Sequence, residues 1–141
     1  MIIEIRVWCN NKNEWEKDPC YIGTDGTLYQ EFGKTHGLHI CSKDNHIVEL
    51  STGLKDKDGV DIYEGDIING KWTHEDSNGY EAIFDFENAE VIYSTEYSAF
   101  IVPCTYDKYI KSPIASYRNF LYQCHDLEVI GNIHETGGGK K

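Results

Sequence analysis

Residues 52–68 read Thr-Gly-Leu-Lys-Asp-Lys-Asp-Gly-Val-Asp-Ile-Tyr-Glu-Gly-Asp-Ile-Ile, and this stretch decides the fold. Asp58-Gly59 has the composition of a tight turn, because glycine adopts positive φ angles without steric cost. Ile62 and Ile67 are the expected core anchors on either side of a second turn, Gly65-Asp66. The stretch therefore predicts two strands joined by turns, with structural roles for its glycines and acidic residues.

The same stretch is rich in carboxylates, so a metal site is the alternative reading. Its acidic side chains are Asp56, Asp58, Asp61, Glu64 and Asp66. Aligned with a calcium-binding loop, the stretch would put Leu54 at the first position and Gly65 at the twelfth, where carboxylates are required. We therefore predict no metal at this stretch.

Further Asx-Gly pairs indicate an antiparallel β protein. They are Asp25-Gly26, Asn69-Gly70 and Asn78-Gly79, and each is typical of a hairpin turn. Alternating apolar and polar residues predict strands at 3–7 and 82–86. The strand that begins at Ile67 is expected to reverse at Asn69-Gly70.

A helix is predicted near the C-terminus. Apolar residues recur at intervals of three and four between Ser112 and Cys124, and Ser112-Pro113 offers a cap and a first-turn proline. A last strand follows at 127–133. The whole pattern predicts a mainly β fold, a small bent barrel with an N-terminal β-hairpin elaboration and one short helix before the last strand.

The signature at 52–68 resembles that of the YopX-like family of phage and prophage proteins. Val129-Ile130-Gly131-Asn132-Ile133 and the opening Ile5-Arg6-Val7-Trp8 resemble the family as well. The resemblance implies a phage or prophage origin and an SH3-type barrel after the signature, and it implies no particular biochemical activity. The signature residues, expected to be structural, are Gly53, Leu54, Asp56, Asp58, Gly59, Ile62, Tyr63, Gly65, Asp66, Gly131 and Asn132.

These observations divide the chain into three parts. Residues 1–50 are expected to form an N-terminal strand and hairpin region packed on the barrel. Residues 51–135 are expected to form the SH3-type barrel that the YopX-like resemblance implies. Residues 136–141 have the glycine-rich composition of a flexible tail.

Charge and composition narrow the function classes. The 141 residues carry a net charge of -11 with only two arginines, Arg6 and Arg118, which argues against nucleic-acid binding. No apolar run has the length of a membrane helix, so we expect a cytoplasmic protein without membrane contact. The cysteines are odd in number and irregularly spaced, which favours reduced thiols: Cys9, Cys20, Cys41, Cys104 and Cys124.

Candidate chemistry is sparse. His36, His39 and Cys41, with His46 downstream and Cys20 upstream, offer zinc ligands, but their spacing matches no zinc motif. We predict no metal site or cofactor, and Cys20, His36, His39 and Cys41 are the residues to test if zinc binds. His125-Asp126 lacks any oriented nucleophile, so no catalytic residue is predicted and the protein is not expected to be an enzyme.

Tyrosines suggest a binding role. Tyr93, Tyr97, Tyr106 and Tyr109 flank expected loops, and tyrosine is enriched where proteins meet, although many of the tyrosines are expected to be strand residues with buried rings. We hypothesise a non-enzymatic module that binds a host or phage protein or assembles with itself as a homo-oligomer. The alternatives are an acidic decoy that mimics DNA toward a host enzyme, and an enzyme or nucleic-acid module whose site the sequence does not reveal.

Overall fold

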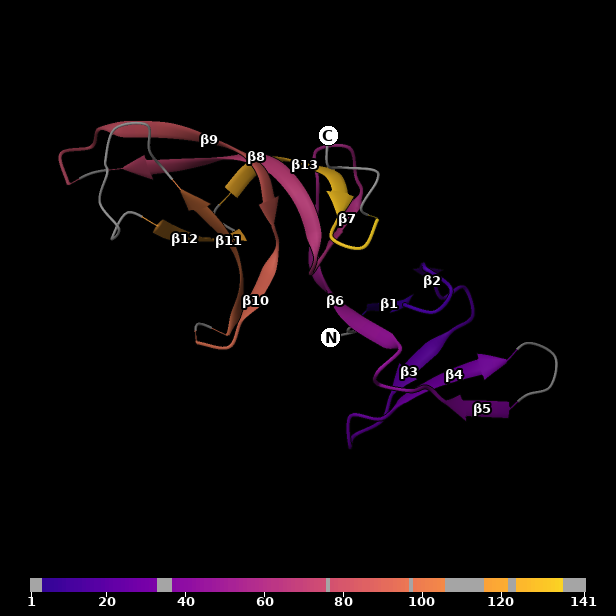
Figure 1. The fold of residues 1–141 in the computed structure, drawn as a ribbon. Helices are drawn as coiled ribbons and strands as arrows, with labels where there is room; N and C mark the ends of the chain where they lie inside the picture. The colour runs from indigo at the N-terminus through magenta and orange to yellow at the C-terminus, as the bar shows by residue number, and fades with distance from the viewer. Residues whose placement is uncertain are drawn as a thin grey trace. The chain divides into compact units, whose positions relative to one another are not determined.

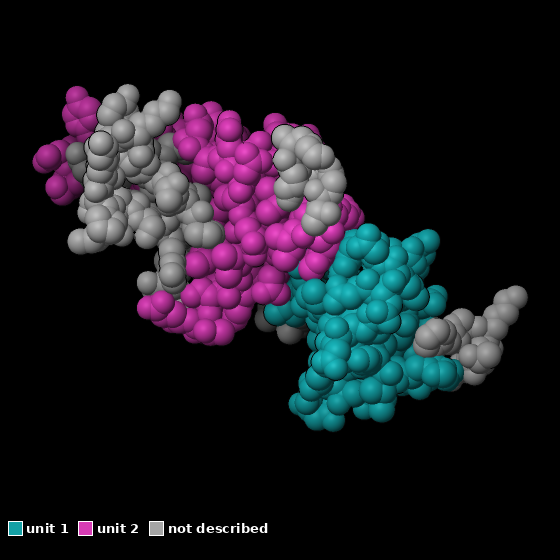
Figure 2. Space-filling view, viewed as in Figure 1, with its two compact units in different colours: residues 1–51 teal, residues 52–141 magenta. Residues whose placement is uncertain are grey.

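A computed structural model describes residues 4–32, 37–75, 77–96, 98–105, 116–121 and 124–135. The regular elements in these ranges are strands, and no α-helix occurs among them. The chain forms two compact units, residues 1–51 (unit 1) and residues 52–141 (unit 2), coloured separately in Figure 2. No helix in the described ranges has the length and apolar character needed to cross a membrane.

Unit 1 contains two small antiparallel sheets (Figure 1). In one, β1 lies between β2 and the first half of β6; in the other, β4 lies between β3 and β5. The strands are β1 (Ile5–Cys9), β2 (Glu14–Trp15), β3 (Cys20–Ile22), β4 (Leu28–Phe32), β5 (Gly37–Ile40) and β6 (His46–Lys55).

The core of unit 1 joins one face of each sheet. Val7 on β1 is paired with Val48 on β6, and both pack with Leu28 of β4 and Cys41, which follows β5. Cross-strand partners share a face of a sheet, so the alternate residues of β3, β4 and β5 point away from this core.

Unit 2 is built from curled antiparallel strands around one core. Its described sheets have the orders β13-β8-β9 and β10-β11-β12, and β7 pairs with the second half of β6. The strands are β7 (Asp61–Tyr63), β8 (Asp66–Glu75), β9 (Glu81–Glu90), β10 (Ile92–Ser94), β11 (Ala99–Thr105), β12 (Ser116–Phe120) and β13 (Cys124–Asn132). Buried residues from both three-stranded sheets, from β7 and from two connecting positions form the core: Ile62, Ile68, Phe86, Ala89, Val91, Val102, Leu121 and Leu127. The predicted mainly β, barrel-like fold is confirmed, and the SH3 type stays a prediction.

The helix predicted between Ser112 and Cys124 is wrong where the structure describes it. Residues 116–120 form β12, which pairs with β11 from Ile101↔Phe120 to Thr105↔Ser116. Only a few apolar residues follow the three-and-four period, and hydrogen bonds to a neighbouring strand override such a weak local preference. Residues 112–115 lie outside the described ranges.

Three of the four turns predicted at Asx-Gly pairs are confirmed and one is wrong. Gly26, Gly59 and Gly79 have φ angles of 83°, 83° and 82° and lie in turns between paired strands. At Asn69-Gly70, however, β8 continues without reversing, with an irregularity in its pairing to β9 between Ile68 and Gly70. Glycine is required here by packing, because a Cβ on residue 70 would lie only 2.6 Å from the side chains of Leu127 and Phe86 in the core.

Candidate functional site

The face of β3, β4 and β5 that points away from the unit 1 core is a candidate binding surface. Tyr29 on β4 is paired with both Tyr21 on β3 and Ile40 on β5, and Glu31 is paired with Leu38. These five residues therefore share one face of the sheet. We call Tyr21, Tyr29, Glu31, Leu38 and Ile40 the outer face.

The outer face exposes large apolar side chains. Leu38 is 61% exposed, Ile40 is 73% exposed and Tyr21 is 49% exposed. The Tyr21 hydroxyl donates a 3.0 Å hydrogen bond to Glu31 Oε2, which together with the carboxylate charge raises the pKa of Tyr21. β5 is also an edge strand in the described sheet, and edge strands offer unpaired backbone groups to a partner.

The tyrosines predicted as a partner surface are largely outside the described residues. Tyr93 lies on β10, is 36% exposed and contacts Phe100 edge to face, with ring centroids 5.2 Å apart. Tyr97, Tyr106 and Tyr109 are not among the described residues. The outer face was missed because its residues come from three short strands whose pairing the sequence does not show.

In the signature, Asp56 accepts hydrogen bonds from three backbone amides. Its Oδ1 accepts from Asp58 N at 2.8 Å and from Val60 N at 2.9 Å, and its Oδ2 accepts from Val129 N at 3.0 Å. Burial alone raises the pKa of Asp56, but these hydrogen bonds outweigh it and hold the pKa below its ordinary value. The carboxylate thus joins the turn after β6 to β13.

Asp66 and Asn132 form a second polar group in the signature. They are buried cross-strand partners at the ends of β8 and β13. Asp66 Oδ2 accepts a 2.8 Å hydrogen bond from Tyr63 N, while Asn132 Oδ1 accepts from the amides of His134 and Glu135, both at 2.9 Å. Both side chains therefore accept hydrogen bonds from backbone amides close to them in the sequence.

The other signature residues lie in turns, in the core or in paired strands. Gly53 and Gly65, like Gly59, have positive φ angles, which glycine adopts most readily. Ile62 lies in the core, with Leu54 packed against the same cluster, whereas Asp58 is exposed. Gly131 is the cross-strand partner of Ile67.

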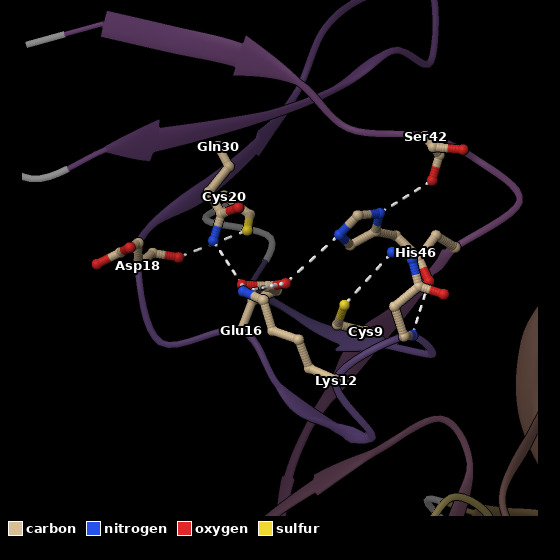
Figure 3. Close-up of polar contacts among 10 residues, drawn as sticks. Cys9, Lys12, Glu16, Asp18, Cys20, Gln30, Ser42 and His46 are labelled. Atoms are coloured by element: carbon tan, nitrogen blue, oxygen red, sulfur yellow. Dashed lines mark hydrogen bonds and ion pairs between the residues drawn. The ribbon is translucent and has the colours of Figure 1, made fainter.

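A polar cluster lies at one end of the unit 1 core, where β1, the segment after β2 and β6 meet (Figure 3). Cys9 and His46 are cross-strand partners, and Glu16 N donates to Val7 O at 2.8 Å, which places Glu16 on the same face. Cys9 Sγ, one Glu16 carboxylate oxygen and one His46 ring nitrogen all lie within 4.8 Å of one another. We call these three residues the Cys9–Glu16–His46 cluster.

Glu16 is the centre of this cluster. Its side chain is only 3% exposed, and it receives hydrogen bonds from Gln30 Nε2 at 2.7 Å and from Lys12 Nζ at 3.3 Å. Burial alone raises the pKa of Glu16, but the hydrogen bonds from Gln30, Lys12 and Cys9 lower it further than burial raises it. A buried carboxylate held in its charged form is a suitable ligand for a cation.

Of the histidines and cysteines singled out together from the sequence, only His46 belongs to this cluster. Cys20 and Cys41 point into the same core, where burial raises the pKa of Cys20 to about 11 and also raises that of Cys41. His39 is exposed on β5, and His36 is not among the described residues. The cluster was missed because its members lie 7 and 30 positions apart and follow no motif spacing.

These features define a class: a small, mainly β protein with a curled-sheet unit tied together by a signature turn. The family profile for YopX protein matches residues 4–138, and the chain belongs to the YopX family. The crystal structure of protein yopX from Bacillus subtilis is similar with a TM-score of 0.52 and 18% identity, covering 97% of each chain. Protein EF1440 from Enterococcus faecalis is similar with a TM-score of 0.50 and 23% identity, covering 97% of this chain and 96% of that one. No curated protein sequence gave a significant match.

Proposed function

We propose that this protein is a non-enzymatic binding module of a phage or prophage, which acts in the bacterial cytoplasm by engaging another protein through its outer face. The exposed apolar surface of Leu38, Ile40 and Tyr21 carries the proposal. Such side chains gathered on one sheet face, beside an edge strand, are typical of a surface that a partner covers.

Energy and charge indicate the kind of partner. Covering an exposed leucine or isoleucine contributes on the order of 1–2 kcal/mol for each side chain. Glu31 lies within the outer face, and the whole chain has a net charge of -11. The partner surface is therefore expected to combine apolar residues with lysine or arginine, whereas a second copy of this chain would bring like charge to the contact.

A matched pair of substitutions tests the proposal. Ile40 on the outer face and Ile83 on β9 are both exposed strand isoleucines, at 73% and 60%. The tagged wild type, Ile40→Asp and Ile83→Asp are expressed in the bacterial host, and the proteins that co-purify are quantified at low and at moderate salt.

We expect one stoichiometric protein to be retained by the wild type and Ile83→Asp and to fall at least tenfold with Ile40→Asp. Equal retention by all three chains would exclude the outer face as the binding surface. A partner that is lost at moderate salt from every chain would instead support the acidic decoy, because exposed charge pairs are screened by salt. Light scattering on the purified chains identifies a second copy as the partner if only the wild type and Ile83→Asp are dimers.

A further inference from the structure

The contacts of His46 fix which of its nitrogens faces the cluster. Nδ1 lies 2.9 Å from the carbonyl oxygen of Ser42, as Figure 3 shows. A carbonyl only accepts, so Nδ1 carries a proton and donates it. Nε2 then faces Glu16 Oε1 at 3.4 Å. A histidine that donates one ring N–H to a backbone carbonyl while presenting the other nitrogen is the usual arrangement of a metal ligand.

The separation of His46 and Glu16 matches that of two ligands of one cation. Both Nε2 without its proton and a carboxylate oxygen are acceptors, so they approach each other only with a proton or a metal ion between them. In a tetrahedral zinc site with bonds of 2.0–2.2 Å, neighbouring nitrogen and oxygen ligands lie roughly 3.3 Å apart. The observed 3.4 Å therefore needs almost no adjustment for zinc.

Cys9 supplies the third ligand atom. Its side chain is buried at 1% exposure, and its sulfur is positioned by a 3.5 Å hydrogen bond from Asn45 Nδ2. Asn45 is itself held by Asn11 N, which donates to Asn45 Oδ1 at 2.7 Å. These two hydrogen bonds hold the Cys9 sulfur on the side of Glu16 and His46.

We propose that the Cys9–Glu16–His46 cluster binds one Zn²⁺ through Cys9 Sγ, Glu16 Oε1 and His46 Nε2, with a fourth position for water. Sulfur, nitrogen and oxygen ligands together suit zinc better than magnesium or calcium, which take oxygen ligands. A thiolate and a carboxylate neutralise the ion. Lys12, whose side chain is 55% exposed, moves into solvent as the metal takes its place beside Glu16. This site is separate from the outer face and does not depend on the proposed binding function.

The test is a measurement of metal binding to the 141-residue chain. The chain is purified with a chelator, and the chelator is removed before the titration. Isothermal titration with Zn²⁺ is expected to give about one ion per chain. It should also show release of the proton of the Cys9 thiol, measured as an enthalpy that changes with the buffer. Titration with Co²⁺ should give a thiolate-to-cobalt charge-transfer band together with the visible absorption of tetrahedral cobalt.

Two groups of variants locate the ligands. Cys9→Ser and His46→Gln are expected to weaken Zn²⁺ binding at least about 100-fold, since loss of a supporting contact alone costs 10–100-fold. The control is Cys41→Ser, which removes a thiol of the same core that is not one of the three proposed ligands, and it should leave the affinity within about threefold. Circular dichroism of each variant confirms that it folds.

Three results would overturn the proposal. They are the absence of Zn²⁺ binding by the wild type, cobalt spectra without the charge-transfer band, and loss of binding in Cys41→Ser with retention in Cys9→Ser. The first result would mean that a proton, and not a metal ion, lies between His46 and Glu16. The third result would mean that zinc binds instead to the cysteines first suggested by the sequence.

Discussion

Replacing Asp56 with asparagine is expected to destabilise unit 2 strongly although the two side chains have nearly the same shape. The carboxylate accepts hydrogen bonds from the amides of Asp58, Val60 and Val129 with both of its oxygens. Asparagine keeps only one oxygen, and its amide group must face at least one backbone N–H. At least one of these three backbone N–H groups then loses its acceptor on residue 56.

The magnitude follows from the number of bonds. A hydrogen bond to a charged group contributes about 1.5–3 kcal/mol, and the substitution removes one completely and makes the others neutral. We therefore expect a loss of about 2–4 kcal/mol in the free energy of unfolding. Such a loss is a large fraction of the 5–15 kcal/mol typical of a whole domain.

Urea unfolding followed by circular dichroism, together with hydrogen exchange at the Val60 and Val129 amides, measures the effect. The control is Asp58→Asn, the same chemical change at an exposed position two residues away, which should cost less than about 0.5 kcal/mol. An Asp56→Asn protein as stable as the wild type, or one destabilised no more than the control, would refute the role given to this carboxylate.

The difference in unfolding free energy between the wild type and Asp56→Asn is expected to depend on pH. The folded pKa of Asp56 lies below its ordinary value, so its stabilisation is present above the unfolded pKa of about 3.9 and is lost as the pH falls through the folded pKa. The stability difference between the wild type and Asp56→Asn should therefore be constant near neutral pH and shrink below about pH 4. A difference that grows on acidification would contradict the sign of this shift.

Two further outcomes are expected. Gly70→Ala should cost about 1–3 kcal/mol in urea unfolding, because the new Cβ would lie 2.6 Å from the Leu127 and Phe86 side chains, and an unchanged midpoint would show that these side chains move aside freely. Cys20, with its pKa raised to about 11, should react with iodoacetamide much more slowly than an unfolded control at pH 8, as measured by peptide mass spectrometry; equal rates would contradict the burial that raises this pKa.

Local signals predicted much of the fold. The turns at Asp25-Gly26, Asp58-Gly59 and Asn78-Gly79 depend on backbone angles that a dipeptide already determines. At Asn69-Gly70 the same kind of dipeptide was misread, because its glycine is required by side chains distant in the sequence. The strand at 116–120 depends likewise on its pairing with β11, which no local periodicity reveals.

The candidate sites were harder to predict than the fold for a related reason. His36, His39 and Cys41 stand out in the sequence because they are neighbours in the chain, with Cys20 and His46 farther away on either side. Antiparallel pairing instead brings Cys9 to His46, while a continuation of the β1–β2 ladder adds Glu16. The register of β1 with its two neighbours creates the cluster, and register was not available from composition or spacing.

The alternation along β4 has an evolutionary consequence. Leu28 and Gln30 are buried in unit 1, whereas Tyr29 and Glu31 point the other way. Substitutions at Leu28 and Gln30 are therefore constrained by packing, and substitutions at Tyr29 and Glu31 are not. Mutations at the outward positions leave the interior undisturbed and change only what the sheet presents to its surroundings. A lineage can therefore change the chemistry of the outer face, step by step, by substituting every second residue on these strands while the framework persists.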